Sequence, residues 1–186
     1  MFKILIGVII AAIGTLITFM VIDPNISISN NDSSSSSSSS EVQDGYFSVT
    51  IEGEVSKPGS YTLAEGSTMD DLIDAAGGIT DYTDELAYFT TADLEGGQTY
   101  YIPSKYDTTN ICSLVEITKV NINEDSADKL LTVNAFTTSV ANSIVSYRAE
   151  HGDFMTIESI QDVYGIGAAT YRKLRNYIIL HEWSSY

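Results

Sequence analysis

A short run of glycine and basic residues near the carboxyl end is the part of this chain best suited to chemistry. Gly165-Ile166-Gly167 can form a tight turn between two helices, because glycine adopts positive φ at no steric cost. The N–H groups of Ala168 and Ala169 would then open a helix, point outward and hold a phosphate oxygen. Three basic residues follow on the next turns and can neutralise neighbouring phosphates: Arg172, Lys173 and Arg175. The pattern predicts phosphate binding that reads no base edge.

Other kinds of chemistry have little support in the composition. The 186 residues include one cysteine, Cys112, which excludes an intramolecular disulfide and every multi-cysteine metal site. Two histidines, His151 and His181, are the only imidazoles, and no nucleophile stands beside a base in a recognisable pattern. We therefore expect a binding protein rather than an enzyme, with no cofactor and no metal.

The glycine turn belongs to an internal repeat with an offset of thirty residues. Four pairs of apolar or aromatic positions align: Leu130 with Ile160, Val133 with Val163, Ile144 with Leu174, and Tyr147 with Tyr177. The repeat predicts two similar units, each a short helix, a hairpin and a longer helix. The expected helices cover residues 126–133 and 138–150 in the first unit, and 156–163 and 168–180 in the second.

The hairpin of the first unit differs from that of the second. Ala135-Phe136-Thr137 stands where the second unit has Gly165-Ile166-Gly167. Neither alanine nor threonine adopts positive φ cheaply, so we expect a reshaped first hairpin. Thr137, Thr138 and Ser139 still offer a helix cap and hydroxyl donors to a phosphate.

Residues 45–106 predict a mixed α and β domain. Alternating residues over 46–55 indicate a strand, Lys57-Pro58-Gly59-Ser60 a turn, and 61–63 a second strand. Ser67 or Thr68 can cap a helix that ends at Gly77-Gly78, and a closing strand follows within 97–103. Asp70 and Asp71 lie in the first turn of that helix, where the helix dipole explains them better than a catalytic carboxylate pair.

The first 44 residues indicate a membrane anchor and a linker. Residues 4–22 carry no charge and have the length of a transmembrane helix. Lys3 precedes them and Asp23 follows, which predicts a cytoplasmic amino terminus and extracellular domains. A cleavable signal peptide is the alternative, although the exit from the apolar segment lacks a small-residue cleavage pattern. Residues 23–44 contain eight consecutive serines and are expected to form a disordered linker.

The net charge of −16 is concentrated in the middle of the chain. Residues 41–118 carry two lysines against fifteen acidic residues, whereas residues 119–186 carry six basic residues against eight. Such a chain cannot bind nucleic acid by bulk attraction, so any such binding must be local. The middle domain is expected to contact protein, itself, a cationic partner or divalent ions, or else only to keep the protein soluble.

Two stretches resemble known families. The phrases Val49-x-Ile51-x-Gly53-Glu54-Val55-x-x-Pro58-Gly59, 75–80 and 97–103 resemble the SLBB family, which implies a β-grasp fold. The phrases 120–130, 141–154 and 163–174 resemble the tandem helix-hairpin-helix domain of the ComEA-type competence DNA receptors. The order of anchor, linker, SLBB-like domain and helical domain is that of the Gram-positive form of these receptors.

The expected organisation is therefore multidomain. An anchor (1–22) and a serine-rich linker (23–44) precede an SLBB-like β-grasp domain (45–106), a connector (107–118), an all-α tandem helix-hairpin-helix domain (119–181) and a tail (182–186). The resemblance implies a membrane-anchored extracellular receptor that binds double-stranded DNA for uptake, with a channel protein as partner and possible self-association through the SLBB-like domain. The alternative is an envelope interaction or assembly module that has lost DNA binding.

Overall fold

The computed structural model describes residues 45–107 and 114–182. The expected anchor, the serine-rich linker and Cys112 lie outside the described residues. Within the described ranges, no helix has both the length and the apolar character needed to cross a bilayer.

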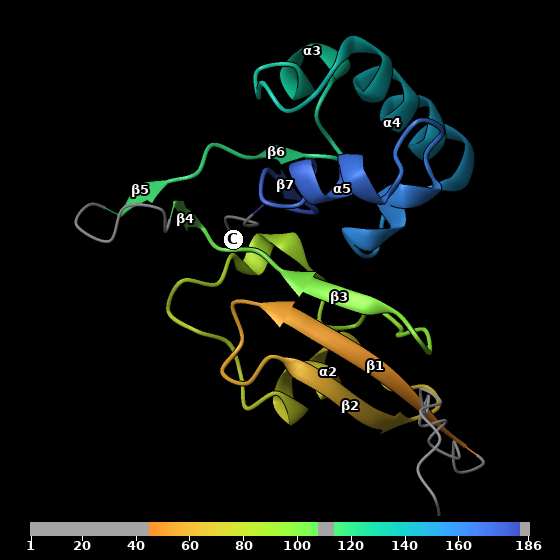
Figure 1. Ribbon diagram of the computed structural model, residues 1–186. Helices are drawn as coiled ribbons and strands as arrows, with labels where there is room; N and C mark the ends of the chain where they lie inside the picture. Colours follow the sequence, from red (N-terminus) through yellow and green to blue (C-terminus); the bar gives the residue numbers. More distant parts are fainter. Residues whose placement is uncertain (1–44, 108–113, 183–186) are drawn as a thin grey trace, which may run out of the picture. The chain divides into compact units, whose positions relative to one another are not determined.

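A three-stranded sheet forms the centre of the SLBB-like domain (Figure 1). Strand β1 (Tyr46–Gly53) pairs antiparallel with β2 (Gly59–Ala64) and parallel with β3 (Thr99–Ile102), in the order β2-β1-β3. Gly53 ends β1 with φ of 90°, and a Cβ there would collide with the carbonyl oxygen of Ile102. Only glycine allows this close approach of the two backbones. The expected strands are confirmed, with slightly different bounds.

One helix, α2 (Met69–Ala75), packs the apolar core of this domain. Its N-cap is Thr68, whose backbone N–H donates to Asp71 Oδ2 at 2.8 Å in a capping box. The carboxylate of Asp71 is therefore engaged in capping, as the helix-dipole interpretation expected. Leu72 and Ile51 are fully buried together in the core behind the sheet. A 3-10 helix, η1 (Glu85–Ala87), follows further along the chain.

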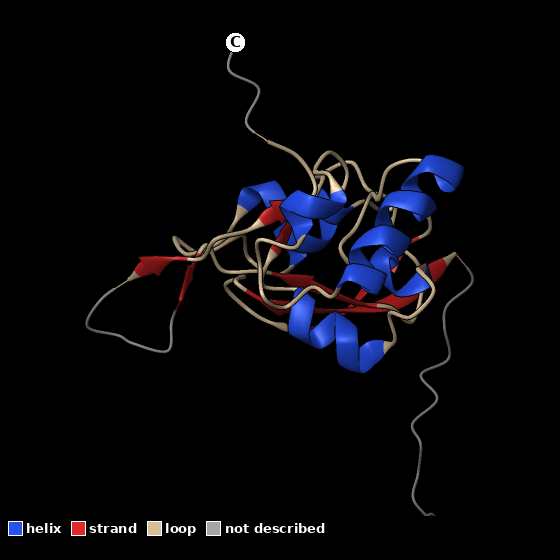
Figure 2. Cartoon of the chain, turned by 90° about the horizontal axis from the view of Figure 1, so that it is seen from above, coloured by secondary structure: helices blue, strands red, loops and turns tan. Residues whose placement is uncertain are grey.

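The segment expected as a connector contains a short ladder. Strands β4 (Tyr106–Asp107) and β5 (Val115–Glu116) pair antiparallel, beside the three-stranded sheet rather than in it (Figure 2). The chain then enters the helical domain.

The helical domain contains two helical units, as the repeat predicted. The first unit has α3 (Ala127–Leu130) and α4 (Thr138–His151). The second has a 3-10 helix, η2 (Glu158–Asp162), and α5 (Ala168–Leu174). Apolar side chains from both units form one core, in which Leu130, Ile144, Ile160 and Leu174 are fully buried.

The expectation of an all-α domain is wrong in one respect. Strand β6 (Val120–Asn121) pairs in parallel with β7 (Ile178–Ile179), so the two ends of the domain meet in a short ladder. The helix expected over 168–180 ends at Leu174 with Arg175 as its C-cap, because the chain then turns so that the carbonyls of Tyr177 and Ile179 accept from the N–H groups of Val120 and Ile122. The helix expected over 126–133 is also shorter, and the one expected over 156–163 is a 3-10 turn.

The two domains are joined by packing and by hydrogen bonds. The N–H of Leu180 donates to the carbonyl of Leu86 at 2.8 Å, and the His181 ring stacks on Phe89 with centroids 4.9 Å apart. Near the same junction, Lys119 Nζ lies 2.7 Å from Asp84 Oδ2, with both side chains largely buried. Residue 181, expected at the end of the helical domain, is thus part of a junction with the SLBB-like domain.

Candidate nucleic-acid interface

The second hairpin, residues 163–167, has the tight turn that its glycines predicted. The N–H of Ile166 donates to the carbonyl of Val163 at 3.0 Å, and Gly165 has φ of 91°. The side chain of Ile166 is only 2% exposed and anchors the turn in the core. Gly167 is the N-cap of α5, with φ of −87°. The side chain of Ile166 therefore anchors the turn in the core, and the groups of the turn that remain for contact with a ligand are those of the backbone.

Exposed residues surround the start of α5. Ala168 and Ala169 form its first turn on the surface, and Arg172 and Lys173 are exposed in its last turn. There is no acidic residue in this first turn. The outward N–H groups and the two basic side chains are thus available to an anionic backbone.

The first hairpin, residues 133–137, closely matches the second in backbone. The N–H of Phe136 donates to the carbonyl of Val133 at 3.0 Å, as Ile166 does to Val163. Thr137 has φ of −101° and ψ of 157°, close to the −87° and 176° of its counterpart Gly167. Since Gly167 never needed positive φ, threonine replaces it without strain. The expectation of a reshaped hairpin is therefore wrong for the turn as a whole. The difference is confined to Ala135, because no described residue other than glycine has positive φ.

The first hairpin also opens a capped helix. The Thr137 hydroxyl accepts a hydrogen bond from the N–H of Val140 at 3.3 Å, as the sequence predicted. Thr138 and Ser139 are exposed in the first turn of α4, which contains no acidic residue. Both hairpins therefore present an exposed helix start without a competing carboxylate.

The thirty-residue repeat generates two related grooves. One, of about 560 Å³, lies between Tyr164 of the second hairpin, with the preceding Asp162, and α4. Its α4 lining includes Ser143, Ser146 and Tyr147. The other, of about 930 Å³, lies between the first hairpin and the corresponding residues of the second unit. Its lining includes Thr132, Asn134, Lys173, Asn176 and Tyr177. Each hairpin thus lines a groove together with residues of the other unit.

Only the groove beside the first hairpin is also lined by the SLBB-like domain and the connector. Glu54, Tyr101, Ser104 and Tyr106 contribute to it. The groove beside the second hairpin is formed by the helical domain alone. The two hairpins therefore share their turn hydrogen bond and helix start but differ at Ala135 and Gly165 and in their surroundings.

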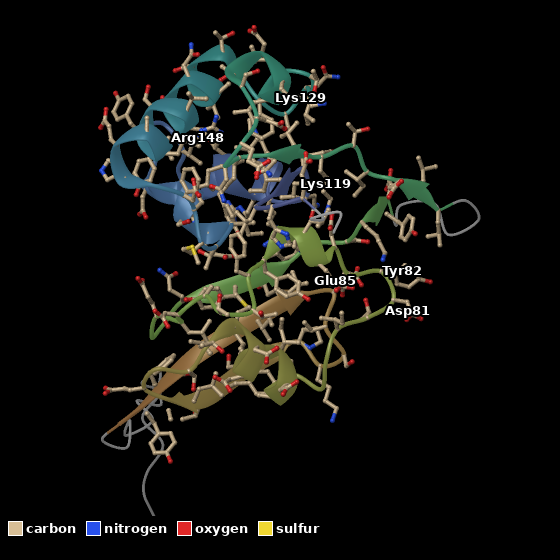
Figure 3. All side chains as sticks on the ribbon, turned by 180° about the vertical axis from the view of Figure 1, so that it is seen from behind. Asp81, Tyr82, Glu85, Lys119, Lys129 and Arg148 are labelled. Atoms are coloured by element: carbon tan, nitrogen blue, oxygen red, sulfur yellow. The ribbon has the colours of Figure 1, made fainter. Side chains whose placement is uncertain are left out.

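Three of the six basic residues of the helical domain are engaged in contacts within the protein, and Figure 3 labels two of them, Arg148 and Lys119. Arg148 donates to the carbonyls of Ile122 and Asp125, each at 2.7 Å, and ties α4 to the loop before α3. Lys119 is paired with Asp84. The third is Arg175, and the remaining Lys129, Arg172 and Lys173 are exposed.

Arg175 is not placed as the sequence predicted. Its guanidinium carbon lies 3.7 Å from the centroid of the Tyr101 ring, and its Nη1 lies 3.3 Å from Glu52 Oε2. Both partners belong to the SLBB-like domain. Arg175 is the C-cap of α5 and keeps helical φ and ψ of −53° and −25°, and its N–H donates to the carbonyl of Tyr171 at 2.9 Å. It therefore shares the buried face of Tyr171, one turn earlier, rather than the exposed face of Arg172 and Lys173. The expected cluster of three basic residues is thus reduced to two.

Tyr164 is a surface residue that the sequence analysis missed. It stands at the tip of the second hairpin, and its side chain is 92% exposed, the highest value among the exposed large apolar and aromatic side chains in the described ranges. The available signal was its place in the sequence between Val163 and Gly165, directly at the predicted turn.

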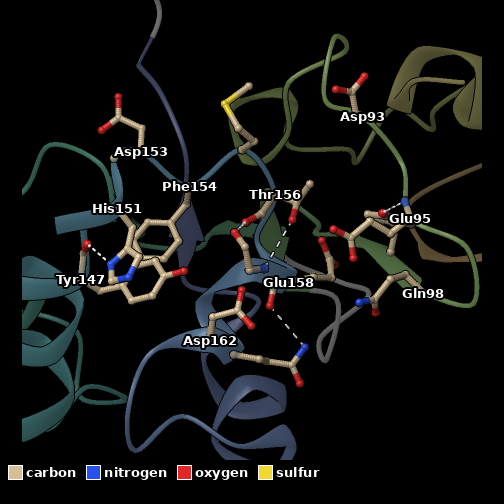
Figure 4. Close-up of a pocket in the computed structure, with 15 residues that line it drawn as sticks. Asp93, Glu95, Gln98, Tyr147, His151, Asp153, Phe154, Thr156, Glu158 and Asp162 are labelled. Carbon is tan, nitrogen blue, oxygen red and sulfur yellow. Dashed lines mark hydrogen bonds between the residues drawn. The ribbon is translucent and has the colours of Figure 1, made fainter. Parts of the chain in front are cut away.

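Glu158 is a buried acid that the sequence analysis also missed. Its Oε1 accepts from the N–H of Tyr101 and from the hydroxyl of Tyr171, both at 2.8 Å, and so joins the two domains. Burial raises the pKa of this carboxyl to about 7, against the smaller opposing effect of these hydrogen bonds. It borders a cavity of about 330 Å³ that Asp93, Glu95, Asp153 and Asp162 also line (Figure 4).

The sequence matches two families of domains. Residues 48–103 match the SLBB domain, and residues 115–179 match the helix-hairpin-helix motif. ComE operon protein 1 of Bacillus subtilis (strain 168) is 31% identical over 139 residues, which is 70% of this chain and 68% of that protein. The chain belongs to the ComEA-type family of competence DNA receptors.

Other relatives of this ComEA-type chain share a shorter stretch. An endonuclease/exonuclease/phosphatase family domain-containing protein 1 of Bos taurus is 38% identical over 60 residues, 32% of this chain and 10% of that protein. An uncharacterized protein of Haemophilus influenzae (strain ATCC 51907 / DSM 11121 / KW20 / Rd) is 39% identical over 62 residues, 33% of this chain and 55% of that protein. Because the chain spans only 10% and 55% of these two proteins, their similarity does not assign the activity of either whole protein to this chain.

Proposed function

We propose that this chain captures double-stranded DNA through the phosphate backbone for uptake during transformation. One observation carries the proposal: the two hairpins share the same turn hydrogen bond and N-cap conformation, and each opens a helix whose exposed first turn lacks acidic residues. Gly165, Gly167, Ala168 and Ala169 form the second contact, and Thr137, Thr138 and Ser139 the first. Membership of the ComEA-type family supports the same function.

Binding of this kind is independent of base sequence. Helix starts and basic side chains meet phosphate oxygens, which every sequence presents in the same way. Arg172 and Lys173 add local positive charge to a domain whose net charge is slightly negative. We expect modest affinity with a shallow salt dependence, because few phosphates are neutralised.

The site of action is part of the proposal. The uncharged residues 4–22, with Lys3 before and Asp23 after, support a single-pass anchor with both domains outside the cell. Residues 23–44 would then link the anchor to the domains, which hand the DNA to a channel protein. Self-association through the SLBB-like domain and a Gram-positive source complete this part of the proposal.

An envelope assembly module without DNA binding is the second candidate. It is favoured by the structural use of Lys119, Arg148 and Arg175, which leaves the helical domain three exposed basic residues. Salt-dependent DNA affinity separates the two candidates.

The deciding experiment is fluorescence anisotropy of a labelled duplex titrated with the full chain in mild detergent over a salt series. We expect saturable binding in the wild type, and in Arg172→Ala/Lys173→Ala a salt slope smaller by about 2, near 0.9 per lost phosphate contact. Lys57→Ala/Lys105→Ala removes the same charge from the SLBB-like domain and should leave the slope unchanged. Absence of binding even at low salt would favour the assembly module.

A further inference from the structure

We propose that the SLBB-like domain restrains DNA binding by holding Arg175 in an autoinhibitory contact, so that separation of the two domains adds a third cation to the DNA-binding face. This inference rests on the proposed function and concerns the regulation of the same site. It gives the acidic residues of the SLBB-like domain the role of holding Arg175 and repelling DNA.

Two interactions hold Arg175 against the SLBB-like domain, and a third holds its ring partner Tyr101 in place. Its guanidinium stacks on the face of Tyr101, 3.7 Å from the ring centroid, where a cation is attracted by the ring quadrupole. Its Nη1 lies 3.3 Å from Glu52 Oε2. The Tyr101 hydroxyl in turn donates to Asn176 Oδ1 at 2.8 Å, which fixes the ring beside the residue next to Arg175.

The strand arrangement brings acidic residues to this contact. In the β1–β3 register Glu52 lies opposite Tyr101, and so the carboxylate and the ring reach Arg175 from adjacent strands. Glu54 follows at the end of β1 and lines the same groove as Lys173 and the first-hairpin residue Asn134. One carboxylate of the SLBB-like domain, that of Glu54, therefore stands where a phosphate backbone would approach Lys173 and the first hairpin, and it repels the phosphates.

The position of Arg175 in the chain allows it to join the DNA-binding face when it is released from the SLBB-like domain. It lies three residues after Arg172 and two after Lys173, directly beyond the end of α5. An arginine side chain is long enough to reach the phosphate side of such a helix end once its ring and carboxylate partners are withdrawn. Each added phosphate contact raises the salt slope by about 0.9 and the affinity by about fivefold at roughly 100 mM salt.

The test is a double-mutant comparison on the full chain by duplex anisotropy over a salt series. Glu52→Gln/Tyr101→Leu removes the carboxylate and the ring face while retaining an apolar side chain in the junction. We expect its affinity to rise about fivefold and its salt slope to rise by about 0.9. Adding Arg175→Ala to this variant should abolish both gains, whereas Arg175→Ala alone should change neither quantity. Glu65→Gln, which removes an exposed carboxylate in the turn after β2, is the matched control and should show no gain.

Each other outcome overturns the proposal in a distinguishable way. An unchanged slope in Glu52→Gln/Tyr101→Leu, with normal wild-type binding, rejects autoinhibition and leaves the proposed function standing. If the affinity gain of Glu52→Gln/Tyr101→Leu persists after Arg175→Ala is added, groups other than Arg175 cause it. If Arg175→Ala alone lowers the salt slope of DNA binding, Arg175 already contacts DNA in the wild type. Loss of all binding in the wild type rejects the proposed function itself. Glu52→Gln alone, which preserves Tyr101 packing, serves if the double variant does not fold, and its expected gain is about twofold.

Discussion

The guanidinium carbon of Arg175 lies 3.7 Å above the ring of Tyr101, although the two residues are 74 positions apart in the sequence. Of the three basic residues clustered at 172–175, the fold thus directs Arg175 toward the SLBB-like domain while Arg172 and Lys173 remain exposed. The three basic residues at 172–175 form one cluster in the sequence, but in the fold one of them makes internal contacts and two lie on the surface.

Arg175→Ala should therefore lower stability rather than DNA affinity. The lost stacking contact and the partly exposed ion pair with Glu52 together correspond to about 1 kcal/mol of unfolding free energy. Urea unfolding followed by circular dichroism measures this loss. Arg172→Ala removes the same type of side chain from an exposed position and should change stability by less than about 0.5 kcal/mol. Equal losses in the two variants would contradict the assignment.

The two glycines of the second hairpin should respond differently to substitution. Gly165 has φ of 91°, so Gly165→Ala forces a side chain into the left-handed region at a cost of about 1–2 kcal/mol. Gly167 has φ of −87° with no heavy atom within 4 Å of an added Cβ, so Gly167→Ala should be tolerated, as Thr137 is at the equivalent position. Thermal unfolding of the two variants provides the comparison. Equal destabilisation would show that the turn depends on both glycines.

Much of this fold could be predicted because local signals agree with the tertiary structure. Thr68 and Thr137 cap helices where their residue types suggested, and the thirty-residue repeat located both hairpins. The early end of α5 could not be predicted, because it depends on pairing of Ile178 with Val120, a contact that local periodicity does not encode. The roles of Arg175 and Glu158 depend on docking of a second domain and were hidden for the same reason.

Stability should fall as pH rises through the titration of Glu158. Its pKa is about 7 in the fold and 4.5 in its ordinary state, so the fold favours the neutral acid. This group's contribution is full below pH 4.5 and is lost progressively as pH rises to about 7, by at most ~3 kcal/mol. Glu158→Gln stays neutral and keeps an oxygen that accepts from Tyr101 and Tyr171.

Comparing the wild type with Glu158→Gln separates the pH dependence of stability due to Glu158 from that due to the other 24 acidic residues. Glu158→Gln should unfold at higher urea concentration than the wild type at about pH 8, and the difference should vanish near about pH 5. Asp153→Asn, at an exposed residue that lines the same cavity, is the control. A constant difference at all pH values would assign the effect to packing rather than titration.

Tyr164 should contribute to DNA binding without contributing to stability. Its side chain is 92% exposed beside the backbone N–H groups of the second hairpin, so a duplex held there meets the phenol, and truncation removes almost no folded contact. Tyr164→Ala should weaken duplex binding about three- to tenfold with an unchanged salt slope, because a neutral side chain releases no counterion. The melting temperature should stay the same. Tyr82→Ala, at another exposed tyrosine in the SLBB-like domain, is the matched control. Wild-type affinity in Tyr164→Ala would confine the DNA contact to the backbone and basic residues of the hairpins.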